Sequence, residues 1–250
     1  MEGLQRVDWD GFYAQPASAV PRLGIPFLRA SLASLPLTLE LPPHPTTTLH
    51  IHQSSSSIST VVWDAGLLLS DFLVHYVHHD HQSLGRVLDL GTGTGIAGIL
   101  SCLLNATAVI FNDISQSKEL AVNLESLSSY SICSPYRIEI FDWALVSTEF
   151  LATLGPFDHV LCADCCYDEK LHPSLLSLLE RLHFHKLILC FKRRFDKAER
   201  RFLEDLCKFI EFYEYPRHFI PCVNIDLQLL DGVHLLIGYN RLWSSLRNAG

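Results

Sequence analysis

Residues 87–95 read Val-Leu-Asp-Leu-Gly-Thr-Gly-Thr-Gly. The first four residues predict a short buried strand, and the remainder predicts a turn with glycine at every second position. Glycine has no Cβ and adopts positive φ readily, so a ligand can approach such a turn closely. The helix expected next would point its free N–H groups at that ligand. Proteins that bind nicotinamide, flavin or S-adenosylmethionine (SAM) all use such turns, so the turn alone does not choose among them.

A second acid follows the next apolar run, where residues 108–112 end at Asp113. In strand–helix–strand units, an acid about 20 residues after the glycine turn binds a pair of ribose hydroxyls. The alternative role for Asp113 is to cap the following helix. Both roles suit a carboxylate at the end of a strand, and the upstream turn favours the ribose.

The spacing Gly91-x-Gly93-x-Gly95 favours SAM over a dinucleotide, whose fingerprint is G-x-G-x-x-G/A. Asp89 lies two residues before the first of these glycines. A carboxylate there would repel a pyrophosphate, but it would accept hydrogen bonds from the amino group of the methionine part of SAM. We therefore expect a SAM site.

Composition limits the class of protein. The 250 residues suit one large domain, or one domain with an arm, and a net charge of −8 disfavours a general nucleic-acid binder. The eight cysteines are too irregularly spaced for a disulfide scaffold and predict reduced thiols, hence a cytoplasmic and possibly also nuclear protein. No signal peptide is expected. The uncharged run 90–111 is interpreted as a turn, helix and strand of a soluble core.

Three parts are expected along the chain. Residues 1–48 form a proline-rich arm, residues 49–242 a folded domain and residues 243–250 a tail. The pattern at 49–62 predicts a β-hairpin that turns at residues 54–57, with its second strand at 58–62. A helix is expected at 65–77, where apolar residues recur on one stripe.

From residue 86 onward, apolar runs alternate with amphipathic ones. The expected strands are 86–89, 107–112, 136–140, 158–163, 186–191, 209–215 and 233–239, and the expected helices are 95–104, 116–127, 172–182 and 196–208. This alternation predicts an α/β fold with a parallel sheet covered on both faces, whose ligands bind beyond the carboxyl ends of the strands. Four acids fall at such ends: Asp89, Asp113, Asp142 and Asp164.

Six short motifs occur in the order typical of one enzyme family. Besides residues 87–95, they are Val62-Trp63-Asp64-Ala65-Gly66, Asn112-Asp113, Asp142-Trp143-Ala144, Ala163-Asp164-Cys165-Cys166-Tyr167 and Phe191-Lys192-Arg193-Arg194. Over about residues 49–240 the chain resembles the family-16 seven-β-strand protein lysine methyltransferases, and most closely the methyltransferase-like 21 group. The resemblance implies a Rossmann-like class I sheet of seven strands and transfer of a methyl group from SAM to a lysine side chain of a protein.

The resemblance also implies roles along the cofactor. Trp63 would pack at the SAM pocket, the glycine turn would line the methionine part and Asp113 would hold the ribose. Trp143 would lie against the adenine, while Asp142 or a neighbouring backbone group would reach the exocyclic amine.

At the substrate end, the resemblance implies that Ala163 and Asp164 close the pocket beneath the sulfonium and that Asp164 to Tyr167 face the incoming lysine. Asp164 would then hydrogen-bond the amine and orient its lone pair, and Tyr167 would offer a ring face and a hydroxyl. The alternatives are helix capping for Asp164 and core packing for Tyr167. The cations Lys192, Arg193 and Arg194 would contact an acidic stretch of the substrate, anchor a loop, or form a solvated run.

Other functions stay open at this point. A nucleic-acid amino-methyltransferase would carry D/N-P-P-Y where this chain has Asp164-Cys-Cys-Tyr167. A small-molecule N-methyltransferase, or a silent SAM-binding interaction module, is also compatible with the fold. No metal site is expected, since the cysteines around Cys162 and the histidines from His75 to His81 lack a complete ligand set. We expect a monomer that contacts neither nucleic acid nor membrane.

Overall fold

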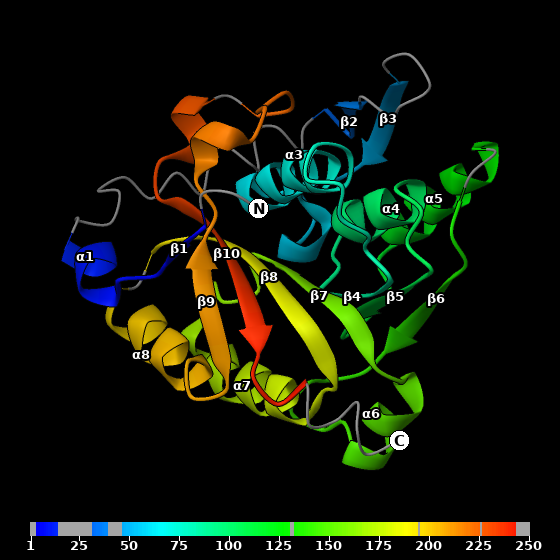
Figure 1. Ribbon diagram of the computed structural model, residues 1–250. Helices are drawn as coiled ribbons and strands as arrows, with labels where there is room; N and C mark the ends of the chain where they lie inside the picture. Colours follow the sequence, from blue (N-terminus) through cyan, green and yellow to red (C-terminus); the bar gives the residue numbers. More distant parts are fainter. Residues whose placement is uncertain are drawn as a thin grey trace.

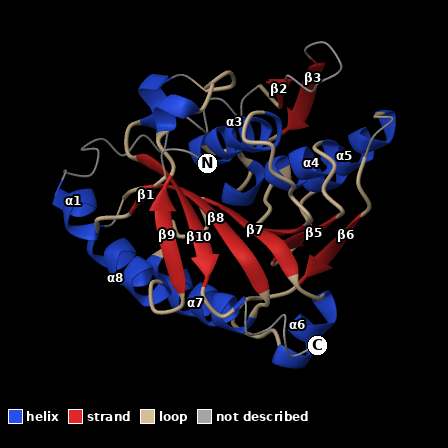
Figure 2. Ribbon diagram, viewed as in Figure 1, coloured by secondary structure: helices blue, strands red, loops and turns tan. Residues whose placement is uncertain are grey.

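Alternating apolar strands and amphipathic helices build one twisted sheet, shown in Figures 1 and 2. The computed structural model describes residues 4–14, 32–39, 47–130, 133–194, 196–225 and 227–243. Within them, the sheet has eight strands in the order β1-β9-β10-β8-β7-β4-β5-β6. The strands are β1 (Gln5–Arg6), β4 (Arg86–Leu90), β5 (Ala108–Asp113), β6 (Tyr136–Ile140), β7 (Phe157–Ala163), β8 (Phe184–Lys192), β9 (Ile210–Glu214) and β10 (Val233–Asn240).

Strands β4 to β8 run parallel, and β10 inserts antiparallel between β8 and β9. The strand order reverses between β4 and β7, and the loops after these two strands lead to helices on opposite faces, so they diverge and leave room for a ligand. The seven expected strands are β4 to β10, and each lies within two residues of its expected bounds. The expected α/β class is therefore confirmed, with β1 added at the β9 edge.

Helices cover both faces of the sheet (Figure 2). One face carries α3 (Asp64–His78), α4 (Ile96–Leu103) and α5 (Lys118–Ser126), and the other carries α6 (Thr148–Leu154), α7 (His172–Arg181) and α8 (Asp196–Leu206). The apolar side chains of each group form a separate core against the sheet. Sequence patterning missed α6 because seven residues make too few turns for a periodic signal.

The expected hairpin at 49–62 is wrong in its pairing. Strand β3 (Thr47–His52) pairs antiparallel with β2 (Ser34–Leu39), which precedes it in the chain, and Ile58–Thr60 is a short 3-10 helix. Buried and exposed residues alternate along β2, and its buried leucines form one row with Leu49 and Ile51 of β3. This shared apolar row favours the pairing of β3 with β2. The serines at 54–57 bond to one another and to Thr60 instead of making a hairpin turn.

Parts of the expected N-terminal arm belong to the fold. Strand β1 pairs with β9, and α1 (Trp9–Ala14) contacts α8. The division into 1–48, 49–242 and 243–250 stays a prediction, and most prolines of the arm and residues 244–250 lie outside the described residues.

Two asparagines join the hairpin formed by β2 and β3 to the rest of the fold. Asn224 accepts from Thr38 N at 2.6 Å, donates to Thr38 O at 3.0 Å and also donates to the Asp71 carboxylate of α3. Asn123 of α5 accepts from His52 N at 2.7 Å and donates to His52 O at 3.0 Å. Each side chain satisfies a backbone amide and a backbone carbonyl at once, as a neighbouring strand would.

Two sequence features have simple structural explanations. The segment Ile58–His78 is long and apolar enough to cross a membrane, but 72% of its 18-residue apolar window is buried inside the fold, and most of the segment is the core helix α3. All eight cysteines lie within the described residues and are free thiols.

Candidate active site

A cavity of about 710 Å³ opens beyond the carboxyl ends of β4, β5 and β7. Every residue expected at the site lines it except Gly95: Trp63, Asp89, Gly91, Gly93, Asp113, Asp142, Trp143, Ala163, Asp164 and Tyr167. Gly95 instead begins α4 at φ +86°, and a Cβ there would lie 2.6 Å from Leu120 Cδ1. Its role is therefore to let the helix start close to α5.

The turn after β4 requires glycine at its other two positions. Gly91 and Gly93 have φ of +61° and +54°, where a Cβ is strained. A Cβ on Gly93 would lie 3.0 Å from Ser59 O, and one on Gly91 would lie 3.3 Å from the Trp143 ring. Asn123 Nδ2 donates to Thr94 O at 2.9 Å, so the same asparagine that holds the hairpin also fixes this turn.

Asp89 is a buried acid with one oxygen committed to the protein. Its Oδ2 accepts from Thr92 Oγ1 at 2.5 Å and from Gly98 N at 3.0 Å. No group in the described part of the chain donates to Oδ1. Burial raises the pKa of Asp89 to about 7, and the charge of Asp113 adds to the rise. A positively charged amine at Oδ1 would relieve this cost, which fits the role expected from the sequence.

Asp113 does not cap the next helix, because Ser117 does so by accepting from Leu120 N. The Asp113 carboxylate instead accepts from Gly93 N at 2.9 Å and from Ile114 N at 2.7 Å. These two bonds fix the carboxylate at the cavity wall, with lone pairs left for hydroxyl donors.

Trp143 forms the wall opposite the glycine turn, and a residue missed by sequence reasoning orients it. Trp143 Nε1 donates to Asn112 Oδ1 at 2.8 Å, and Asn112 Nδ2 donates to Glu139 O at 3.0 Å. Asn112 is fully buried, and a lone amide within an apolar strand was the signal available in the sequence. Asp142 Oδ1 accepts from Ala144 N at 2.8 Å and so shapes the loop that carries Trp143.

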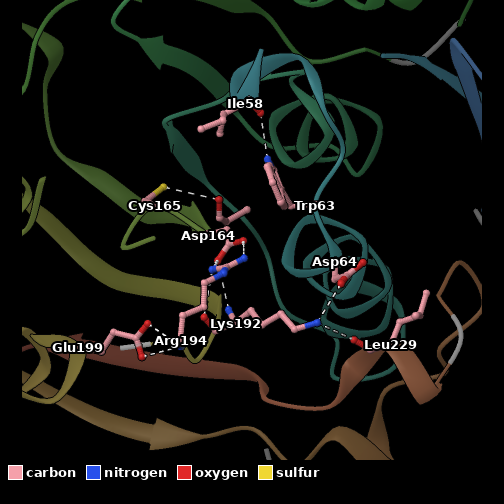
Figure 3. A network of polar contacts seen from close by, with 10 residues as sticks. Ile58, Trp63, Asp64, Asp164, Cys165, Lys192, Arg194, Glu199 and Leu229 are labelled. Atoms are coloured by element: carbon pink, nitrogen blue, oxygen red, sulfur yellow. Dashed lines mark hydrogen bonds and ion pairs between the residues drawn. The ribbon is translucent and has the colours of Figure 1, made fainter. Parts of the chain in front are cut away.

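Asp164 is not free at the substrate end, as Figure 3 shows. Arg194 NH1 and NH2 donate to its two oxygens, both at 2.7 Å, and Lys192 N donates to Oδ1 at 3.2 Å. That Asp164 hydrogen-bonds the incoming amine stays a prediction, but its carboxylate is already paired with a cation, which the sequence did not indicate. Asp164 also has φ of +57°, which asparagine and aspartate tolerate better than other non-glycine residues.

The run Lys192-Arg193-Arg194 is neither solvated nor free to meet an acidic substrate. Lys192 Nζ lies 3.3 Å from Asp64 Oδ2, and Arg193 NH1 donates to Phe12 O at 2.8 Å. Lys192 and Arg193 are both buried. Cations that follow a strand appear as a surface run in sequence, and only the packing of α1, α3 and α8 around them shows that they are internal.

Two aromatic side chains flank the mouth of the cavity near Asp164. Trp63 Nε1 donates to Ile58 O at 3.0 Å, and its ring lies 5.9 Å from the Arg194 guanidinium carbon. Tyr167 is 37% exposed, and partial burial raises the pKa of its hydroxyl. The phenol is therefore protonated and available to solvent and to an incoming side chain.

Within the described ranges, no three His, Cys, Asp or Glu side chains are placed to hold a metal ion. The histidines at the end of α3 lie away from the cavity; His75 stacks on His79.

Comparison with known proteins gives the family. The profile of a family described as lysine methyltransferase matches residues 44–209. Protein N-lysine methyltransferase METTL21A of Danio rerio is 30% identical over 151 residues, 60% of this chain and 67% of the relative. Protein-lysine methyltransferase METTL21E of Mus musculus is 25% identical over 185 residues, 72% of this chain and 73% of the relative.

The fold also matches a solved structure. A candidate SAM-dependent methyltransferase from Streptococcus mutans superposes with a TM-score of 0.51 and 10% identity, over 82% of this chain and 55% of that chain. This likeness is one of fold. The family profile covers more than half of the chain, which therefore belongs to the lysine methyltransferase family, whose methyl donor is SAM.

Proposed function

We propose that this protein transfers the methyl group of SAM to the Nζ atom of a lysine in a protein substrate, with the cofactor and the lysine meeting in the cavity beyond β4 and β7. The observation that carries the proposal is the joining of two sets of residues in one cavity. The glycine turn, Asp89 and Asp113 suit a cofactor that carries an amine and a ribose, and Asp164 and Tyr167 lie where a side chain would enter.

The cavity fits SAM in size and in chemistry. A volume of about 710 Å³ is typical of cofactor sites. In our proposal, Asp89 Oδ1 binds the amino group, Asp113 binds the ribose hydroxyls, and the Trp143 ring lies along the adenine. Trp63 and Ala163 border the reacting end. Asp142 acts through the loop that it shapes.

The reaction is an in-line displacement, in which the lysine lone pair forms the new N–C bond while the C–S bond breaks and its electron pair stays on sulfur. Catalysis then depends on positioning and on exclusion of water. A free lysine has a pKa of about 10.4, so its amine must lose a proton to solvent before it can react. The Tyr167 ring and hydroxyl are placed to guide that amine, and the partly apolar mouth favours its uncharged form.

We also propose that the protein acts as a monomer in the cytoplasm and also in the nucleus, without binding nucleic acid or membrane. The free thiols support a reducing compartment, and the net charge of −8 disfavours a nucleic-acid substrate.

Labelling from SAM tests the function. Purified protein incubated with methyl-labelled SAM and a cell lysate should label a band that protease removes and nuclease does not. Acid hydrolysis should then release methylated lysine. Label found only in nucleic acid or in small metabolites would refute the proposal.

The cofactor assignment has its own variant and control. Asp113→Ala should weaken SAM binding about tenfold or more, because it removes a charge-assisted pair of hydrogen bonds. Asp205→Ala removes an exposed aspartate that pairs with Lys208 and should leave binding unchanged. Equal SAM affinity of the two variants would show that Asp113 does not bind the cofactor.

A further inference from the structure

The substrate end of the cavity presents a neutral pair of charges. The Asp164 carboxylate receives both terminal nitrogens of Arg194 at 2.7 Å, and the two side chains are only 5% and 16% exposed. Paired hydrogen bonds of this kind are short, planar and strong. The lysine therefore meets a carboxylate whose charge is already balanced by Arg194, and such a carboxylate stabilises an ammonium ion less than an unpaired one would.

Other contacts hold Arg194 in place from three sides (Figure 3). Its backbone N donates to the Glu199 carboxylate of α8 at 2.9 and 3.1 Å, and NH1 donates to Lys192 O at 3.1 Å. The guanidinium also faces the Trp63 ring. Withdrawing it would leave Asp164 as a buried, uncompensated charge, which is strongly unfavourable. The pair is thus a permanent part of the wall.

Other charged groups lie near the pair. Lys192 is paired with Asp64, and the buried Glu199 carboxylate accepts from the Arg194 backbone N–H. Burial raises the pKa of the Cys166 and Cys190 thiols, so both stay neutral. The remaining titratable groups that line the cavity are Asp89, Asp113, Asp142, Tyr167 and the thiol of Cys165. Without Arg194, the uncancelled charge at the reacting end would be negative.

We propose that Arg194 is a specificity-determining residue of the transfer: by neutralising Asp164, it lets the cavity hold the lysine as the uncharged amine that can react, instead of trapping it as an ammonium ion. The inference rests on the proposed function. An unpaired carboxylate within a few ångströms would raise the pKa of the bound amine by about 1 to 3 units, so the uncharged, reactive fraction of the bound lysine would fall about tenfold to a thousandfold.

Ligand binding tests this without any substrate. Sinefungin carries an amine in place of the methyl-bearing sulfonium, whereas S-adenosylhomocysteine (SAH) is neutral there. We would measure both affinities by calorimetry for wild type, Arg194→Met, Arg194→Lys and the double variant Asp164→Asn/Arg194→Met. The preference for sinefungin should rise about tenfold in Arg194→Met. It should stay near the wild-type value in Arg194→Lys and return to it in the neutral double variant.

Arg200→Met is the matched control, because Arg200 lies on α8, shortly after Arg194 in the chain, but pairs with Asp10 and Glu204 at the surface. Its preference should equal that of wild type. An unchanged preference in Arg194→Met, with SAH binding intact, would overturn the inference. Loss of SAH binding in Arg194→Met would indicate misfolding, and Asp164→Asn then decides. That variant leaves the Arg194 cation without its carboxylate, so a charge effect requires its preference for sinefungin to fall about tenfold, and an unchanged preference would overturn the inference.

Turnover gives a second, independent readout once a labelled protein is in hand. The pH of half-maximal rate should move up by about one unit or more in Arg194→Met, with KM lowered at neutral pH and kcat reduced. Arg194→Lys should restore the pH profile even if its rate is lower. A uniform loss of kcat at every pH would show a purely structural role. If wild type labels no protein, the proposed function fails, while the sinefungin measurement still decides the role of Arg194.

Discussion

Asp89 makes cofactor binding depend on pH in a direction that the structure determines. Burial raises the pKa of this carboxyl from 3.8 to about 7 in the ligand-free protein. An amine at Oδ1 binds the ionised form better, so bound ligand favours loss of the proton. Affinity should therefore be high above pH 7 and should fall as the pH drops through 7.

The magnitude follows from the ionised fraction. A carboxyl with a pKa of about 7 is roughly nine-tenths ionised at pH 8 and roughly one-tenth ionised at pH 6. If binding requires the carboxylate, the affinity for SAH should fall about tenfold over that range, which is about 1.4 kcal/mol. At pH 7, binding should release about half a proton per site.

Calorimetry of SAH binding at pH 6, 7 and 8, in buffers of different ionisation enthalpy, measures both quantities. Asp89→Asn is the matched control, since an amide oxygen still accepts from Thr92 and Gly98 but does not titrate in this range. It also reports any titration of the ligand itself. The reasoning is refuted if wild-type affinity is constant between pH 6 and pH 8, or if Asp89→Asn shows the same dependence.

Three further substitutions test how the cavity is built. Gly93→Ala should cost about 1–2 kcal/mol of unfolding free energy and abolish tight SAH binding, because its φ is +54° and its Cβ would lie 3.0 Å from Ser59 O. Asn123→Ala should lower stability by about 2–3 kcal/mol and weaken SAH binding several-fold, since it loosens both the hairpin and the glycine turn. Asn224→Ala should lower stability by a similar amount, about 2–3 kcal/mol, without changing SAH affinity, because its contacts with Asp71 and β2 lie outside the cavity. Thermal and urea unfolding, together with SAH calorimetry, measure all three.

Matched variants keep these outcomes specific. Gly155→Ala introduces a side chain at φ +77° with ordinary contacts and no part in the cavity, so it should lose stability but keep SAH binding. Equal loss of binding in Gly93→Ala and Gly155→Ala would mean that strain alone explains the first result. Equal SAH affinity in Asn123→Ala and Asn224→Ala would contradict the role of Asn123 in fixing the turn.

The sequence predicts a structural feature well when nearby residues in the chain cause that feature. The buried strands β4, β5, β7 and β8 are short and mostly apolar, and each ends at or just before a glycine, an aspartate or a lysine, so their bounds were predictable within two residues. The hairpin was not, because Thr47–His52 can pair with either neighbour by pattern alone. The pairing with Ser34–Leu39 is decided by which row of leucines the helices of that face can bury.

The cofactor half of the site was determined largely by the sequence itself. Gly91, Gly93, Asp89 and Asp113 lie on two adjacent strand ends, and a single strand–helix–strand unit brings them together. The substrate half was decided only by tertiary structure. Arg194 reaches Asp164 from another strand end, 30 residues away along the chain, and Glu199 and Trp63 fix it from two further elements. The electrostatic environment of a buried group depends on the residues that the fold brings next to it. The sequence therefore did not show that Asp164 forms an ion pair in the protein.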